Sequence, residues 1–377
     1  MKQKQKIIVN FLFNFSVLIF FSLIVFLMGE LTVRLFLPQP LENPINFYVA
    51  DDLLGWKLKP DLHQWYINPE FKMEVISNER GFRDSSHTLQ KNKDTIRILG
   101  LGDSMLFGYG VNINEGILSR MQVALQKNAS LNKKIETINM GIPGYNINQY
   151  EKALRNEGYK FHPDLAILFL YNNDWKEDSS FDCKGVSNDG FLITGDKFSF
   201  KSARSFLVPL RVFLKRHSQL YILIRGRMDA VLKRKKLMAL PEIQVYKNNV
   251  NFDVTYFHTL ELINSMSKFC KQNINCRFLV CLIPEKFQVD DTYLNLIIAA
   301  YGIKKEEYDW LQPQKALEKF CRENDISYLD LWPTIRKIYY QGKLYFDIDP
   351  HLNSQGYSVA SEEICSFIEK ARLLKEK

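Results

Sequence analysis

The sequence is poor in the residues that build disulfide scaffolds and metal centres. Its 377 residues include only 6 Cys and 6 His. No two cysteines form a Cys-x-x-Cys pair, and the histidines show neither HExxH nor HxH spacing. This pattern excludes a disulfide-rich fold and argues against a zinc site built on cysteine pairs. We expect no metal and no cofactor, with Cys270 and Cys276 either bridged locally or present as buried free thiols.

Long hydrophobic runs are also rare. Residues 7–29 carry no charge, and no second run of this length exists. A helix of about 20 apolar residues spans a bilayer. Lys2, Lys4 and Lys6 precede the run, so the positive-inside rule places residues 1–6 in the cytoplasm and the rest beyond the membrane. A cleaved signal peptide is the alternative, but the run is long for one and no Ala-x-Ala site follows it.

Acidic residues are nearly absent from residues 201–237. This segment holds eleven Lys and Arg and a single acid, Asp229, so the net charge of +8 comes from one part of the chain. That distribution excludes a globally basic protein, and we expect no nucleic-acid partner. A basic amphipathic helix on anionic lipid is one interpretation of the segment, and a solvated cap helix is the other.

From residue 95 onward, short apolar runs alternate with helical patterns. The runs cover 95–101, 135–139, 164–170, 276–283 and 327–331. The helical patterns cover 115–127, 147–158, 253–272, 314–324 and 354–373. Such alternation predicts an α/β fold with a parallel sheet and helices on both faces. We predict a linker and N-terminal extension over 30–94 and a main domain over 95–377, with a strandless cap insertion over 175–250.

Five residues with catalytic potential lie in loops at predicted strand ends or before the last helix. They are Ser104 in the tripeptide Gly102-Asp103-Ser104, then Gly144, Asn173, Asp349 and His351. Each alone has an ordinary explanation as a turn or helix cap. Parallel strands place their carboxyl ends at one edge of the sheet, where ligands bind. Together the loops offer a nucleophile, a base, an acid and oxyanion donors.

The order of these residues resembles the SGNH, or GDSL-type, hydrolase superfamily over residues 95–174 and 327–373. Flanking motifs resemble its membrane-anchored bacterial branch. They are Leu54-Gly55-Trp56-Lys57-Leu58-Lys59-Pro60, Gly81-Phe82-Arg83-Asp84 and Asp349-Pro350-His351-Leu352-Asn353. The resemblance implies a flavodoxin-like three-layer sandwich preceded by one transmembrane helix at 7–29. It also implies a bacterial inner membrane, with the catalytic domain periplasmic or extracellular.

Carried over residue by residue, the resemblance implies a complete serine hydrolase site. Ser104 would be the nucleophile, His351 the base and Asp349 the acid that orients it. Ser104, Gly144 and Asn173 would form the oxyanion hole.

Two positions depart from the pattern of this superfamily. Tyr171 stands where the family usually has Gly, and a bulky side chain there would narrow the pocket or tilt Asn173. The family acid usually lies three residues before the His, where this chain has Ile348, whereas Asp349 lies two before. Asp347 is the alternative acid.

The resemblance and the expected location suggest an esterase or acyltransferase that acts on acyl groups, acetyl above all, of a cell-surface glycan. A lysophospholipase or other lipid-directed esterase is the first alternative, and a catalytically inactive binding or assembly module is the second. We expect substrate specificity to depend on the insertion at 175–250. Trp175 follows the third predicted strand, where it would lie either at the pocket rim or in the core.

Overall fold

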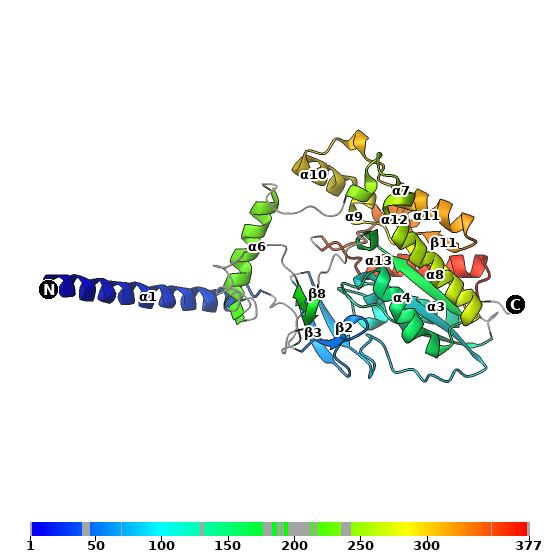
Figure 1. Cartoon of the computed structure of the whole chain (residues 1–377), viewed down its shortest axis with the longest axis horizontal. Coiled ribbons are helices and arrows are strands. Elements are labelled where there is room, and N and C mark those ends of the chain that lie inside the picture. The colour runs from blue at the N-terminus through cyan, green and yellow to red at the C-terminus, as the bar shows by residue number, and fades with distance from the viewer. Residues whose placement is uncertain are drawn as a thin grey trace. The chain divides into compact units, whose positions relative to one another are not determined.

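The computed structural model describes residues 2–39, 46–68, 70–128, 132–175, 183–186, 190, 192–194, 210, 213–214, 217–234, 243–347 and 349–374. These residues fall into two compact units. The first contains α1 (Lys2–Phe36) and α6 (Gln219–Arg234), and the second contains the central sheet with the helices that cover it. Figure 1 labels these elements.

A five-stranded sheet forms the centre of the second unit. Its strands are β5 (Thr95–Leu101), β6 (Lys134–Asn139), β7 (Leu165–Leu170), β10 (Arg277–Leu282) and β11 (Ser327–Asp330). They pair in the order β11-β10-β7-β5-β6, and every neighbouring pair is parallel. In chain order this is the 2-1-3-4-5 arrangement of flavodoxin-like folds. The predicted α/β fold with a parallel sheet is therefore confirmed.

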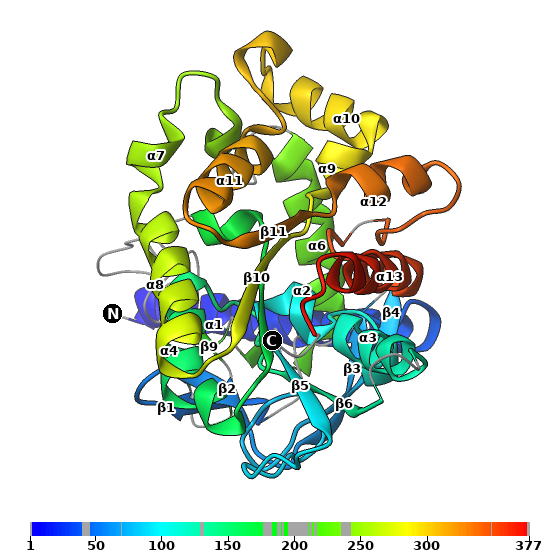
Figure 2. The same ribbon diagram turned by 90° about the vertical axis from the view of Figure 1, so that its right-hand side faces the viewer.

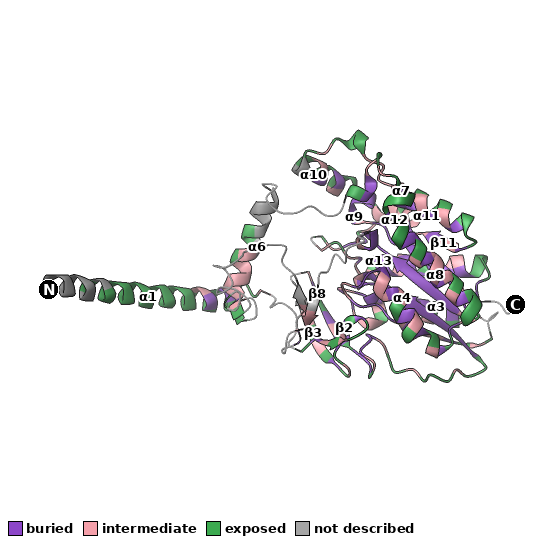
Figure 3. Ribbon diagram, viewed as in Figure 1, coloured by how far each residue is buried: buried purple, intermediate pink, exposed green. Residues whose placement is uncertain are grey.

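Both faces of the sheet are buried, which explains why its strands are apolar runs rather than alternating ones. Ile98, Ile167 and Leu279 pack on one face with α3 (Ile117–Gln126) and α13 (Ser354–Lys370). The residues that follow them in each strand pack on the opposite face with α4 (Ile147–Asn156), α8 (Phe257–Asn273) and α11 (Gln312–Glu323). Figure 2 shows the two helical layers, and Figure 3 shows the buried strands between them.

Further helices lie in the second unit. They are α2 (Ser104–Phe107), α7 (Phe252–Thr255), α9 (Lys286–Val289), α10 (Asp291–Tyr301) and α12 (Trp332–Tyr339). Cys270 and Cys276 are buried free thiols, so no local disulfide bridges them.

Two antiparallel hairpins precede the central sheet. One pairs β1 (Tyr48–Asp51) with β2 (Gly55–Leu58), and the other pairs β3 (His63–Asn68) with β4 (Phe71–Ile76). A third pair, β8 (Cys183–Val186) with β9 (Leu192–Thr194), lies in the segment predicted to contain no strand. That expectation is wrong for these residues because a short antiparallel pair needs only a few extended residues and leaves little periodicity in the sequence.

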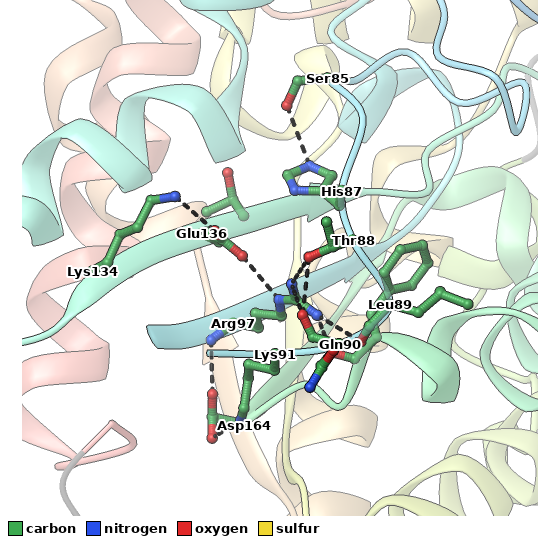
Figure 4. A network of polar contacts seen from close by, with 12 residues as sticks. Ser85, His87, Thr88, Leu89, Gln90, Lys91, Arg97, Lys134, Glu136 and Asp164 are labelled. Carbon is green, nitrogen blue, oxygen red and sulfur yellow. Dashed lines mark hydrogen bonds and ion pairs between the residues drawn. The ribbon is translucent and has the colours of Figure 1, made fainter. Parts of the chain in front are cut away.

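The amino end of β5 is held by a buried arginine (Figure 4). The Arg97 side chain is 2% exposed, and its guanidinium donates to Glu136 of β6 at 2.9 Å. The same group donates to the carbonyl oxygens of Leu89 and Phe161, at 3.1 and 2.9 Å. The backbone N–H of Arg97 donates to Asp164, the residue before β7, at 2.7 Å. Arg97 therefore connects the segment before β5 to β6 and to the start of β7.

In the first unit, α1 contains a stretch, Leu12–Phe36, that is long and apolar enough to cross a membrane. The described side chains of this stretch are almost all exposed, as Figure 3 shows. A signal sequence near the N-terminus would pass the same test of length and composition.

Candidate active site

Ser104 stands directly beyond the carboxyl end of β5. Asp103 is the N-cap of α2, and its carboxylate accepts a hydrogen bond from the Met105 N–H at 2.8 Å. Ser104 is thus the first residue of the helix and not its cap, which leaves its hydroxyl available. Gly102 permits this turn, since a Cβ there would lie 2.8 Å from the Leu106 Cβ.

Three side chains form a continuous hydrogen-bonded chain. The His351 Nε2 atom lies 2.7 Å from the Ser104 Oγ atom. The His351 Nδ1 atom lies 2.5 Å from the Asp349 Oδ1 atom. The three residues predicted as nucleophile, base and acid are therefore brought together, although 247 positions separate Ser104 from His351. The imidazole ring also packs against Tyr109, with ring centroids 4.6 Å apart.

The loop that carries Asp349 and His351 is closed by its own backbone. An antiparallel bridge joins Tyr345 to Leu352, and the Phe346 N–H donates to the His351 carbonyl at 3.1 Å. Inside this hairpin an acid two residues before the histidine reaches its Nδ1 atom. Asp347 does not, because its exposed carboxylate pairs with Lys343 at 2.7 Å.

Two charged side chains from other elements hold the same loop. The Lys286 ammonium donates to the carbonyl oxygens of Phe346 and Asp347, at 2.8 and 2.7 Å. The Glu70 carboxylate, from the turn between β3 and β4, accepts the Asp349 N–H at 2.7 Å. Sequence reasoning missed both residues, and 279 positions separate Glu70 from Asp349, so no local pattern could have indicated the contact.

Asp349 is set up to remain ionised. Its burial raises the pKa of the carboxyl, but the hydrogen bonds from His351 and the electrostatic attraction between the two groups outweigh burial, so the pKa lies below its usual range. An ionised carboxylate on Nδ1 fixes the imidazole tautomer that leaves Nε2 free to accept the Ser104 proton.

The predicted oxyanion donors line one cavity with the nucleophile. Ser104, Gly144, Asn173 and His351 all border a cavity of about 390 Å³. Gly144 has a φ of 83°, a left-handed conformation that favours glycine. The Asn173 Nδ2 atom donates to Asp103 at 2.9 Å, and since an amide nitrogen carries two N–H groups, a second remains for a ligand.

Two buried acids lie behind the oxyanion side of the site. Burial raises the pKa of Asp103, although the Met105 N–H, His351 and Asn173 oppose the rise. Burial and the neighbouring Asp103 charge raise the pKa of Asp174 well above its usual range. Like charges in one buried site disfavour double ionisation, so each carboxylate makes the other harder to ionise.

Tyr171, the first departure from the family pattern, does not narrow the cavity. Its side chain is absent from the cavity lining, and its hydroxyl donates to the Glu285 carboxylate at 2.5 Å. Burial raises the pKa of Glu285 to about 7, against the opposing hydrogen bonds of Tyr171 and Asn172. The backbone N–H of Tyr171 donates to Asp174 at 2.9 Å, which holds the turn that presents Asn173.

The N-terminal hairpins and their flanks supply part of the cavity wall. Phe47, Tyr48, Tyr66 and Met73 border the cavity beside Phe107, Tyr109 and Pro143. Sequence reasoning had assigned 30–94 to a linker and extension and so missed this contribution. Trp175 is in the core and not at the rim, since it is 2% exposed and packs against Phe252 and Tyr256.

Arg83, from the Gly81-Phe82-Arg83-Asp84 motif, holds the carboxyl end of α2. Its buried guanidinium donates to the carbonyl oxygens of Phe107 and Gly108, at 3.0 and 2.8 Å. Burial lowers its pKa to about 10, which still leaves it charged at neutral pH. Within the described residues no group of three or more His, Cys, Asp or Glu side chains is arranged to hold a metal.

No protein-family model matches the sequence, and a comparison with curated proteins gives no match. Solved structures with a similar arrangement include the acetyl xylan esterase AlAXEase, with 15% identity and a TM-score of 0.40 over 72% of this chain and 98% of that one. A member of the lipolytic G-D-S-L family from Veillonella parvula has 13% identity and a TM-score of 0.36, over 72% and 97%.

An acetylxylan esterase from Geobacillus stearothermophilus, solved as a catalytic mutant, has 10% identity and a TM-score of 0.39, over 75% and 95%. Because all three TM-scores lie below 0.5, the case for catalysis depends on the hydrogen bonds of this chain's own site. These neighbours are GDSL-type and acetyl xylan esterases, the group that the sequence motifs resemble.

Proposed function

We propose that this chain is a serine esterase or acyltransferase of SGNH type. The observation that carries the proposal is the chain of hydrogen bonds from Ser104 through His351 to Asp349. A catalytically inactive binding module does not require a serine, a base and an ionised acid at hydrogen-bonding distances. The intact triad therefore favours catalysis over the inactive alternative.

In the first step, the Ser104 Oγ atom attacks the carbonyl carbon of an ester while His351 Nε2 accepts the hydroxyl proton. The resulting imidazolium is stabilised by the ionised Asp349. Collapse of the tetrahedral intermediate breaks the ester C–O bond, and His351 returns the proton to the leaving alcohol. Water, or the hydroxyl of an acceptor sugar, then attacks the acyl-enzyme by the same route.

The negative charge on the tetrahedral oxygen needs donors on the opposite side of the carbonyl. We assign this role to the N–H groups of Ser104 and Gly144 and to the Asn173 amide. Removing one such donor typically costs about 3 kcal/mol of transition-state stabilisation. The bond from Asn173 to Asp103 fixes the amide before substrate arrives, so no reorganisation is needed during the reaction.

The cavity supports a neutral ester as substrate. Its size of about 390 Å³ lies within the usual range for small-ligand sites. Apart from the proposed catalytic residues its lining is aromatic or apolar, and among the described residues no Asp, Glu, Lys or Arg borders it. Tyrosine rings combine an apolar face with a hydroxyl, which suits an acylated sugar. We therefore propose acyl groups of a surface glycan, acetyl above all, as the substrate.

The proposed location is a bacterial inner membrane, with the catalytic unit on its periplasmic or extracellular side. The apolar helix near the N-terminus and the lysines that precede it support this orientation. A lipid-directed esterase remains the competing function, since the same apolar lining would accept an acyl chain.

Hydrolysis assays on the full-length chain in detergent test the proposal. The substrates are an acetylated xylo-oligosaccharide and a lysophospholipid, each with wild type and Ser104→Ala. Release of acetate that Ser104→Ala abolishes supports the glycan esterase. Turnover of the lysophospholipid alone would replace it with the lipid-directed enzyme. If folded wild type turns over neither substrate nor a small activated acetyl ester, the esterase proposal is wrong.

A further inference from the structure

A carboxylate near the end of the apolar helix caps a second helix in the first unit. Glu30 directly follows the uncharged run 7–29. Its side chain accepts hydrogen bonds from the Ser218 hydroxyl at 2.8 Å and from the N–H groups of Gln219 and Leu220, at 2.9 and 3.0 Å. These N–H groups belong to the first turn of α6, where intrahelical acceptors are lacking. Glu30 therefore ties the start of α6 to α1.

Further contacts fix the same junction. The Arg34 side chain donates to Glu30 at 2.7 Å and to the His217 carbonyl at 2.7 Å. Val33 is buried, and a Cβ at Gly29 would lie 2.9 Å from a methyl group of Leu220. Residues 29, 30, 33 and 34 occupy one face of α1, since helical neighbours recur at three to four positions. The junction is thus a packed contact and not a single bond.

The junction sets the direction of α6. In Figures 1 and 2, α6 runs across the end of α1 and does not continue along it. If α1 crosses a bilayer with residues 7–29 in the hydrocarbon, Glu30 lies at the membrane boundary. A helix fixed there and directed across α1 lies along the plane of the membrane surface.

The exposed face of α6 combines apolar and positive side chains. Ile224, Arg227 and Met228 are exposed and lie at the i, i+3 and i+4 spacing of one helix face. The surrounding segment 201–237 contains eleven Lys and Arg against one acid. Interfacial helices have this composition, because apolar side chains enter the acyl boundary while basic groups reach anionic headgroups.

From these observations we propose that α6 lies on the bilayer surface at the end of α1 and binds anionic phospholipid headgroups. The inference depends on the membrane anchoring proposed above. Lipid is favoured over an acidic protein or polysaccharide because the exposed face of α6 pairs Arg227 with the apolar Ile224 and Met228, and α6 is joined to a helix that is long and apolar enough to cross a membrane. The function of α6 is then to add a second, charge-dependent attachment beside the anchor.

Quenching of a fluorophore on α6 tests the proposal in the full-length chain. The chain is placed in nanodiscs of phosphatidylcholine, or of phosphatidylcholine with one quarter phosphatidylglycerol. Met228→Cys carries an environment-sensitive dye in a Cys183→Ser background, since the other five cysteines are buried. Val123→Cys on α3 is the matched control, because Val123 and Met228 are similarly exposed, at 58% and 57%.

We expect phosphatidylglycerol to lower acrylamide quenching at position 228 by at least about two-fold and to leave position 123 unchanged. The added substitutions Arg225→Gln and Arg227→Gln should remove most of this protection. Glu30→Ala should also reduce it, because the start of α6 is released from α1.

Four results would overturn the inference. Lipid charge has no role if quenching is equal in the two lipids, or if protection survives both arginine substitutions. Protection that appears with soluble heparin but not with phosphatidylglycerol assigns the face to another polyanion. A chain that does not enter the nanodiscs contradicts the anchor itself, while leaving the esterase assays in detergent unaffected.

Discussion

The two ends of β5 both bury polar side chains, but they satisfy them differently. At the amino end, every nitrogen of the Arg97 guanidinium has an acceptor, and Glu136 and Asp164 complete the network (Figure 4). At the carboxyl end, the Asn173 Oδ1 atom is buried without a hydrogen-bond partner among the described residues.

This difference separates a structural network from a reactive one. A fully paired buried charge contributes rigidity and has no group left for a substrate. An unpaired buried polar atom costs free energy and persists where function requires it. The comparison predicts that changes at the carboxyl end affect the rate of reaction, while changes at the amino end affect the free energy of unfolding.

Ser104→Ala should give the largest effect on activity. Loss of the nucleophile is expected to lower kcat by about 10⁴-fold or more. The free energy of unfolding should change by no more than about 0.5 kcal/mol, because Asp103 caps α2 and Ser104 does not. Ester turnover and denaturant unfolding in detergent measure the two quantities. A variant that is inactive because it is unfolded would not support the comparison.

Arg97→Leu should produce the opposite result. Removing the guanidinium leaves one carboxylate oxygen of Glu136 and two carbonyl oxygens without this donor, while Lys134 still pairs with the other oxygen of Glu136. The loss is expected to cost about 3 kcal/mol of stability. The folded fraction should keep wild-type kcat and KM, since the site lies at the other end of the strand. If the well-folded variant loses catalysis by more than ten-fold, the two ends are coupled and the comparison fails.

Asn173→Ala removes one oxyanion donor from the carboxyl end. We expect kcat to fall by about 10²–10³-fold with little change in KM, because the bond strengthens only in the transition state. The test is a steady-state measurement on an activated acetyl ester. A rise in KM at unchanged kcat would instead assign Asn173 to ground-state binding.

Glu285 should make the free energy of unfolding depend on pH. Its pKa is raised by burial from 4.5 to about 7, so the folded state binds the proton more tightly than the unfolded state does. The contribution of Glu285 to stability is therefore fully present at low pH and is lost as the pH rises from about 5 to 8, by about 3 kcal/mol in total.

Glu285→Gln should abolish this loss, since the amide cannot ionise. Unfolding free energies of wild type and variant at pH 5 and pH 8 give the comparison. A pH dependence that is the same in both proteins would exclude Glu285 as its source.

Glu70→Ala should have the smallest effect. Loss of the acceptor for the Asp349 N–H loosens the loop that carries the acid and base, and we expect kcat to fall by about ten-fold at unchanged KM. Glu70→Gln should restore most of the activity because its amide oxygen accepts the same bond. Equal losses in both variants would mean that the negative charge matters and the hydrogen bond does not.

The central sheet was predictable from the sequence, and the resemblance of the motifs indicated that Ser104, His351 and Asp349 would meet as a triad. Fully buried parallel strands appear as continuous apolar runs, and the catalytic loops follow them at one edge of the sheet. The hairpins formed by β1–β4 were not predicted. Their strands are short and mix polar with apolar residues, so the sequence shows little strand periodicity there. Glu70 and Lys286 were missed because their partners are distant in sequence and are backbone groups.

The central claim is that the carboxyl end of β5 activates a single serine. Mass-spectrometric mapping of a fluorophosphonate adduct on the full-length chain tests it most directly. We predict one adduct, on Ser104, that His351→Ala abolishes and folded Arg97→Leu retains. Folded wild-type protein without an adduct, or an adduct on another serine, would contradict the account.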